Sequence, residues 1–227
     1  MNFAAEKDCY IVVDAIFEES PNAKRIFQAF KNSSNYYKLI KLKGLSKDTP
    51  QLTDLRLGWS ICKNQYFNER LLTLSEVTNF SNSTFLESLA TIDLQNRVWA
   101  DNQVNNEYVN IYKNEKDLYH RKIKAGLDRG IKIFEQSKIV DKVISPDAGN
   151  ILFVKISDSV KSKINVKNDH DMFVYVLEKA NILITPGHVF GISSDELWFR
   201  ITMSKSIENF EAGINKLLTV LEGDYVI

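Results

Sequence analysis

The sequence has few cysteines and no excess of charge of either sign. Its two cysteines, Cys9 and Cys62, lie far apart in no CxxC or Cys/His cluster, so neither a redox motif nor a metal site is indicated. We therefore expect a reduced, cytoplasmic protein without a bound metal. Lysine plus arginine and aspartate plus glutamate both number 29, so the formal net charge is zero. This balance gives no reason to expect nucleic acid or a membrane surface as a partner.

Long apolar runs are also missing. No run approaches the roughly 18 residues that suggest a transmembrane helix, and the first ten residues, MNFAAEKDCY, lack the basic and apolar regions of a signal peptide. Of the 227 residues, 44% are apolar and 26% are charged, as in an ordinary globular protein. The length allows one large domain or two small ones.

The first part of the chain has the pattern of an α/β protein. Three segments rich in β-branched and aromatic residues predict strands: 9–17, 36–42 and 55–61. Between the first two, segment 21–34 begins with proline and carries apolar residues at Ile26, Phe27 and Phe30, which predicts a crossover helix. Strand, helix and strand in this order favour the α/β class.

The middle of the chain is predicted to be helical. Segment 83–92 has apolar residues three and four positions apart. The polar stretch from Trp99 to Lys138 continues this spacing as one long helix or two in sequence, because Gly126 and Gly130 weaken its continuity. We place a domain boundary within this helical connector, which gives domains of residues 1–120 and 121–227.

After residue 150 the pattern changes to short strands and helices. The predicted strands are 151–156, 182–185 and 197–203, and the predicted helices are 169–180 and 206–223. Ser206 fits the N-cap of the last helix, with Asn209 where a capping-box glutamate would stand.

Four charged residues follow or lie within the predicted strands in a definite order. Asp14 ends a strand, Lys47 follows the next one, and Arg56 and Arg200 lie within later strands. They belong to the motifs VVDAIFEE, KGLSK, TDLRLGW and LWFRITMSKSIENFEAGINKLL, with ITPGHVFG before the last. This ordered set resembles the C-terminal half of a class I/II aminotransferase, a pyridoxal-phosphate enzyme of fold type I. The resemblance extends over nearly the whole chain and depends on the set, because each motif alone is weak.

The resemblance implies a fold and a role for each residue. Residues 1–120 would be part of the large cofactor-binding domain with the start of the interdomain helix, and residues 121–227 the small α/β domain. Lys47 would form a Schiff base with pyridoxal 5′-phosphate and later move a proton. Asp14 would keep the pyridine nitrogen protonated. Arg56 and Ser46 would bind the phosphate, and Arg200 the carboxylate of an amino acid or 2-oxo acid.

Each of these residues also has a simpler structural explanation. Lys47 and Asp14 could be ordinary turn residues, and Arg56 could lie at the edge of the sheet with its charge in water. Arg200 could form a structural ion pair with Asp195 or Glu196, because an unpaired buried charge is costly. The presence of all the motifs together favours the cofactor site.

Weaker contributors follow from the same resemblance. The segment NFSNST resembles a loop that reaches the active site of the partner subunit in family dimers, so Ser81 and Asn82 would act in trans. Gly187 is expected to support the tight TPG turn. His188, one of three histidines, stands beside that turn, where a lone histidine is more often a bystander.

The sequence departs from the family pattern at several positions. Phe17 stands where the family usually has a cofactor-binding tyrosine, Gly44 replaces the first serine of Ser-x-Ser-Lys, and Asp54 replaces a glycine. Lys47 and Arg56 are also one residue further apart than in the usual pattern. Family members are nearly twice as long, so we expect a homodimer or an assembly in which another chain supplies the N-terminal half.

The leading hypothesis is an aminotransferase that needs such a second half. A pyridoxal-phosphate-dependent oxidase, lyase or decarboxylase of secondary metabolism is an alternative, favoured by Phe17 and the altered phosphate loop. A non-catalytic subunit or remnant that keeps the fold is a third. The sequence does not identify the substrate side chain or the amino acceptor.

Overall fold

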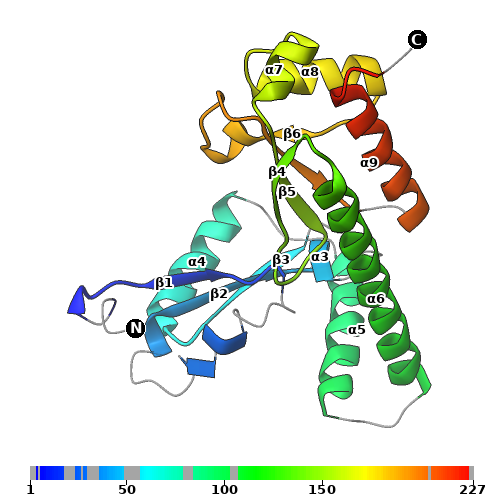
Figure 1. Ribbon diagram of the computed structural model, residues 1–227. Coiled ribbons are helices and arrows are strands. Elements are labelled where there is room, and N and C mark those ends of the chain that lie inside the picture. The colour runs from blue at the N-terminus through cyan, green and yellow to red at the C-terminus, as the bar shows by residue number, and fades with distance from the viewer. Residues whose placement is uncertain are drawn as a thin grey trace. The chain divides into compact units, whose positions relative to one another are not determined.

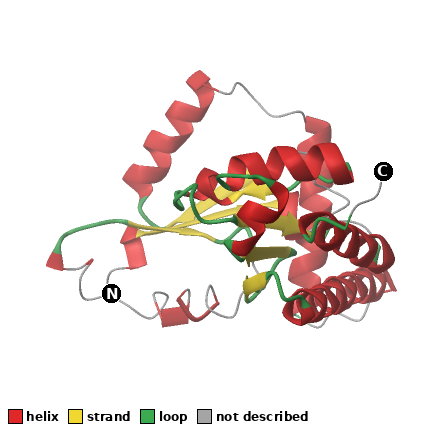
Figure 2. Cartoon of the chain, turned by 45° about the horizontal axis from the view of Figure 1, so that its top comes forward, coloured by secondary structure: helices red, strands yellow, loops and turns green. Residues whose placement is uncertain are grey.

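The computed structural model describes most of the chain, in two compact units (Figure 1). The described residues are 4, 6–17, 24–26, 28–29, 36–48, 57–78, 84–102, 107–203 and 206–224. The first unit is Met1–Asp117 with Asp147–Gly149, and the second is Leu118–Pro146 with Asn150–Ile227. Each unit contains one sheet. Figure 2 shows that the chain is built of both helices and strands, as the α/β class requires.

The first unit contains a three-stranded mixed sheet in the order β1-β2-β3. Its strands are β1 (Ile11–Asp14), β2 (Leu39–Gly44) and β3 (Gly58–Cys62). β1 and β2 are parallel, with Asp14 opposite Leu42, whereas β2 and β3 are antiparallel, with Gly44 opposite Gly58. The predicted strands are therefore present but shifted or shortened; residues 36–38 form a 3-10 turn, η1 (Tyr36–Lys38), before β2.

Helices connect and follow these strands along the chain and lead into the second unit. Residues 24–26 and 28–29 are helical, in agreement with the predicted crossover helix. The further helices are α3 (Leu45–Asp48), α4 (Gln65–Thr78), α5 (Thr84–Asp101) and α6 (Glu107–Gln136). In the part of the chain that the structure describes, no helix has the length and apolar character needed to cross a membrane.

The second unit is built on a four-stranded antiparallel sheet in the order β4-β5-β7-β6. Its strands are β4 (Val140–Ile144), β5 (Ile151–Ile156), β6 (Thr185–Pro186) and β7 (Trp198–Thr202). Its other elements are α7 (Ser159–Ile164), α8 (Asp169–Ala180), the 3-10 turn η3 (Gly187–Phe190) and α9 (Ile207–Leu221). The Ser206 hydroxyl accepts a hydrogen bond from the Asn209 N–H at 3.2 Å, which confirms the predicted N-cap.

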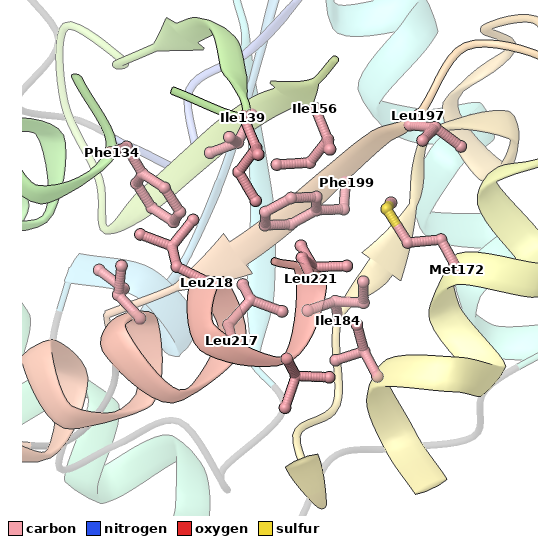
Figure 3. Packing of buried hydrophobic residues seen from close by; sticks show 14 of the residues in the cluster. Phe134, Ile139, Ile156, Met172, Ile184, Leu197, Phe199, Leu217, Leu218 and Leu221 are labelled. Carbon is pink, nitrogen blue, oxygen red and sulfur yellow. The ribbon is translucent and has the colours of Figure 1, made fainter. Parts of the chain in front are cut away.

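One face of this second sheet forms the core (Figure 3). Leu152, Val154 and Ile156 of β5 are fully buried, and so is Phe199 of β7. Helices α6 to α9 supply the facing side chains, and the ring of Phe134 meets that of Phe199 edge-on at 6.2 Å. Burying each such side chain contributes about 1.5–3 kcal/mol relative to exposing it. Because alternate residues point inward, the other residues of β5 and β7 lie on the opposite face.

The sequence predicts one long helix or two over residues 99–138, and in the structure Gly126 and Gly130 both lie within a single helix, α6. It runs without a break from Glu107 to Gln136, and the preceding helix ends earlier, at Asp101. A Cβ built on Gly126 would lie 2.6 Å from the Met203 side chain. Both positions therefore face close neighbours in the same unit, and packing outweighs the low helix propensity of glycine.

Candidate active site

Asp14 and Lys47 lie at the same edge of the first sheet. Asp14 is the last residue of β1, and Lys47 belongs to the short helix α3 that directly follows β2. Since β1 and β2 are adjacent and parallel, their carboxyl ends share one edge. Ligands of open α/β sheets usually bind at the carboxyl ends of parallel strands. The pattern of strands thus brings together the two residues on which the cofactor prediction most depends.

The Asp14 carboxylate is held by its own turn. Its Oδ1 accepts a hydrogen bond from the Ile16 N–H at 3.1 Å. The next residue, Ala15, is buried and donates its N–H to the Leu42 carbonyl at 2.9 Å, which extends the pairing with β2. Asp14 itself is exposed in this chain. A fixed, accessible carboxylate is suited to face a cationic ring nitrogen.

Helix α3, which carries Lys47, is packed into the first unit through its first residue. Leu45 is fully buried and donates its N–H to the Leu57 carbonyl at 3.1 Å. Ser46 is half-buried and Lys47 is exposed. The backbone around the lysine is therefore anchored while its amine remains accessible to a ligand.

Gly44 explains one departure from the family pattern. A Cβ at this position would lie 3.0 Å from Ile16 Cδ1 and 3.1 Å from the Leu57 carbonyl oxygen. Both distances are tighter than ordinary van der Waals contact, so a serine here would require its neighbours to move. The glycine that replaces the family's serine therefore allows the segments around Ile16 and Leu57 to lie close to Gly44 at this edge.

Phe17 packs against backbone. It is half-buried, and its Cε1 lies 2.8 Å from the position that a Cβ on Gly149 would take. Gly149 has a φ of +97°, a conformation that favours glycine. The phenyl ring fills space in the first unit and offers no hydroxyl to a cofactor.

Three predicted site residues lie outside the described part of the chain. They are Arg56, Ser81 and Asn82. The phosphate-binding role of Arg56 and the contribution of the other two in trans stay predictions.

Arg200 lies in the second unit, on the face of the sheet away from the core. Its Nη2 donates to Thr185 Oγ1 at 3.3 Å, and its guanidinium carbon lies 5.2 Å from the centre of the Phe190 ring. Its Nε is buried and has no hydrogen-bond partner among the described residues. A guanidinium with an unsatisfied donor is suited to bind an anion.

The alternative ion pair of Arg200 is not found in the described residues. Glu196 pairs instead with Lys155, with 2.6 Å between Oε2 and Nζ, and accepts a second hydrogen bond from Trp198 Nε1 at 3.1 Å. The hydrogen bond from Lys155 lowers the pKa of Glu196, and the same bond raises the pKa of Lys155. Asp195 accepts a hydrogen bond from Lys161 through its backbone carbonyl. Arg200 therefore keeps its positive charge available.

Sequence reasoning missed the neighbours that hold Arg200 and its turn. Thr185 and Phe190 contact the guanidinium, and neither was a candidate. His188 is paired with the buried Asp169 rather than being a bystander. The motif ITPGHVFG could have drawn attention to Thr185, Phe190 and His188, whereas nothing in the sequence links Asp169 to His188, 19 residues later. Within the described residues, no three His, Cys, Asp or Glu side chains group as a metal site would need.

Comparisons with known proteins agree with the fold. The model of the family "Aminotransferase class I and II" matches residues 1–217. A pyridoxal-phosphate-dependent aminotransferase from Streptococcus suis superposes with a TM-score of 0.73 at 19% identity, covering 100% of this chain and 52% of that one. The aromatic aminotransferase from Pyrococcus horikoshii gives 0.70 at 18% identity, covering 98% and 54%. An archaeal alanine:glyoxylate aminotransferase gives 0.73 at 17%, covering 99% and 50%.

Two further results concern the extent of these matches. No curated protein matches the chain. The chain spans about half the length of the solved structures that it matches.

Proposed function

The chain belongs to the class I and II aminotransferase family, and from this premise we propose that it carries half of an active site for amino-group transfer between an amino acid and a 2-oxo acid. The observation that carries the proposal is the shared edge of the parallel strands β1 and β2, where Asp14 ends β1 and Lys47 follows β2. Arg200, with its unsatisfied Nε, supports the assignment of a carboxylate substrate.

Pyridoxal 5′-phosphate is the cofactor that the family implies, and the residues at this edge fit it. The edge offers an accessible amine at Lys47, a fixed carboxylate at Asp14 and a close approach of backbone at Gly44. When bound, the cofactor supplies an electron sink for the carbanion that forms at the substrate Cα.

This chain's own residues would then bind, orient and move protons. The Lys47 Nζ would hold the cofactor aldehyde and, once released, carry a proton from the substrate Cα. The Asp14 carboxylate would keep the proton on the ring nitrogen. Ser46 and Arg56 would bind the phosphate oxygens, and Arg200 would orient the substrate through its carboxylate.

The remaining half of the site would come from the part of the family fold that residues 1–227 do not include. We propose that the two units are part of the large cofactor-binding domain and the small domain, divided near residue 120. The N-terminal half of the fold would complete the site from outside these residues, and the protein would act in the cytoplasm as a dimer or a larger assembly. The coverage of about half of each relative supports this arrangement.

The test is cofactor binding by the chain together with a polypeptide that supplies the missing half. We expect a visible absorbance band after addition of pyridoxal 5′-phosphate, absent in Lys47→Ala. Lys63→Ala is the matched control, because Lys63 is an exposed lysine that follows β3, at the opposite edge of the same sheet. A band that survives in Lys47→Ala, or no binding by the wild-type assembly, would overturn the proposal and favour a non-catalytic subunit.

A second candidate function is an oxidase, lyase or decarboxylase with the same cofactor. Phe17 favours it, because a ring packed against Gly149 cannot donate the hydrogen bond that the family's tyrosine provides. Product analysis with a set of amino acids separates the two, since transamination alone requires a 2-oxo acid acceptor.

A further inference from the structure

A buried carboxylate holds the turn beside Arg200. Asp169, the first residue of α8, has no exposed surface. Its Oδ2 accepts a hydrogen bond from the His188 backbone N–H at 2.7 Å, and its Oδ1 lies 2.8 Å from His188 Nδ1. A buried carboxylate is costly unless its oxygens are satisfied. Here one residue of η3 satisfies both oxygens, so burial of Asp169 depends on the position of that turn.

The segment that Asp169 holds also contacts Arg200 at both of its ends. Thr185, in β6, accepts a hydrogen bond from Arg200 Nη2, and Phe190, at the end of η3, lies over the guanidinium. His188 lies between these two contacts in the sequence. Asp169 therefore binds the middle of the segment 185–190, and the two end residues of this segment contact Arg200.

The segment has little freedom to shift toward the sheet. A Cβ on Gly187 would lie 2.6 Å from Trp198 Cβ and 3.2 Å from the Trp198 carbonyl oxygen. The turn is therefore in direct contact with β7, the strand that carries Arg200. Movement of η3 would have to take it away from β7, and the two hydrogen bonds to Asp169 oppose that movement.

We propose that Asp169 is a positioning residue for Arg200. Through His188 it fixes η3, and η3 places the Phe190 ring and the Thr185 hydroxyl against the guanidinium. The arginine then keeps one orientation, with its remaining donors free for an anionic ligand. The identity of that ligand, a substrate carboxylate, rests on the proposed function; the positioning itself does not.

The pair has a defined proton arrangement. A carboxylate accepts hydrogen bonds, so the His188 nitrogen that faces Asp169, Nδ1, is assigned as the donor. The groups that face His188 are Asp169 and His170 of α8, the latter with its ring centre 6.0 Å away.

The first test uses the chain alone, labelled with ¹⁵N in histidine and arginine. In the wild type we expect His188 in the Nδ1–H form and a sharp, slowly exchanging Nε–H signal from Arg200. Asp169→Asn can accept only through one oxygen, so it can satisfy only one of the two His188 donors. We expect the Arg200 signal to broaden and its exchange with water to accelerate at least about tenfold.

Asp171→Asn is the matched control. Asp171 also lies in the first turn of α8, but its Oδ2 accepts from the Lys167 N–H at 3.0 Å, not from the turn η3. We expect its Arg200 signal to match the wild type. Unchanged Arg200 exchange in Asp169→Asn would overturn the proposal. If Asp169→Asn does not fold, His188→Ala decides, because it keeps the backbone N–H and removes the ring contact; unchanged Arg200 exchange there would also overturn it.

The second test uses the assembly that contains the missing half. Asp169→Asn should raise KM for the amino acid about tenfold while kcat changes less than twofold, since the residue acts on carboxylate binding and not on proton transfer. A fall in kcat as large as the rise in KM would indicate a general structural defect and contradict the positioning role. If the wild-type assembly has no activity, the proposed function fails, whereas the Arg200 exchange experiment still decides the role of Asp169.

Discussion

Gly130 of α6 and Phe210 of α9 approach so closely that a Cβ on the glycine would lie 2.7 Å from the phenyl Cε1. The same Cβ would lie 2.9 Å from Ile214 Cδ1. The two helices of the second unit thus meet at a residue without a side chain. Glycine costs about 1 kcal/mol relative to alanine inside a helix, and here the close packing of α9 offsets that cost.

The first prediction is that Gly130→Ala destabilises the second unit. The added methyl overpacks the contact, which typically costs about 1–3 kcal/mol, and this outweighs the gain in helix propensity. The measurement is thermal unfolding followed by circular dichroism. Gly213→Ala in α9 is the control, because no described residue apart from the chain neighbours and the surrounding backbone of α9 comes within 4 Å of its new Cβ, and it should stabilise by about 0.5–1 kcal/mol. Stabilisation by both substitutions would refute the packing argument.

The second prediction concerns Arg200→Lys in the assembled enzyme. Lysine keeps the charge but loses the planar pair of donors. Hydrogen bonds to a charged group contribute about 1.5–3 kcal/mol, so KM for the amino acid should rise roughly 10- to 100-fold. Arg129→Lys makes the same change in an exposed ion pair with Glu211 and should leave KM unchanged. A KM equal to that of the wild type would exclude Arg200 from carboxylate binding.

The third prediction concerns Asp14→Asn. Asparagine keeps an acceptor for the Ile16 N–H but removes the negative charge. Loss of a neighbouring opposite charge typically lowers the pKa of a cationic group by about 1–3 units, so the ring nitrogen of the bound cofactor should lose its proton at lower pH. Titration of the visible spectrum measures this change. Asp128→Asn, on the exposed side of α6, should give the wild-type titration; a shift there too would show that the effect is not local.

The fourth prediction concerns the pH dependence of stability from Lys155 and Glu196. The pKa of Glu196 is lowered, so its stabilising effect is present above the usual glutamate pKa of about 4.3 and is lost as pH falls. The pKa of Lys155 is raised, so its effect is present below the usual lysine pKa of about 10.4 and is lost as pH rises. The pair therefore stabilises the fold between these limits.

Melting temperatures from pH 3 to pH 8 test that window. The difference between wild type and Glu196→Gln should be largest near neutral pH and should disappear toward pH 3. Glu178→Gln changes an exposed glutamate on α8 and should give no such trend. A difference that grows in acid would contradict the sign of the Glu196 shift.

The sequence predicted elements well where side-chain pattern and burial agree. Strand 151–156 and helix 169–180 have the predicted bounds, because β5 alternates buried and half-buried residues and Asn168 caps α8 through the Asp171 N–H. Strand β4 and helix α4 were not predicted. β4 has no fully buried residue, and α4 exposes Leu72, Leu74 and Val77, so neither element shows an amphipathic period.

The part of the candidate site formed by Asp14 and Lys47 was predictable from the sequence. Asp14 ends one strand and Lys47 follows the next, and the parallel pairing of those strands is what the α/β pattern implies. The environment of Arg200 was not predictable, because it depends on the turn η3. This turn is held in place by hydrogen bonds to Asp169 of helix α8. Asp169 and His188 contact each other only in the folded chain, and the hydrophobic periodicity of the sequence does not indicate such a contact.

Strand β5 has a partner strand on each side, and its three inward residues, Leu152, Val154 and Ile156, have no exposed surface. Its amides can therefore reach water only when the whole second unit opens. We expect these amides to be the slowest of the described residues to exchange with deuterium, and their rate to report the free energy of opening of that unit. The first sheet, with Val12 exposed on the edge strand β1 and Leu42 exposed on the central strand β2, should exchange sooner.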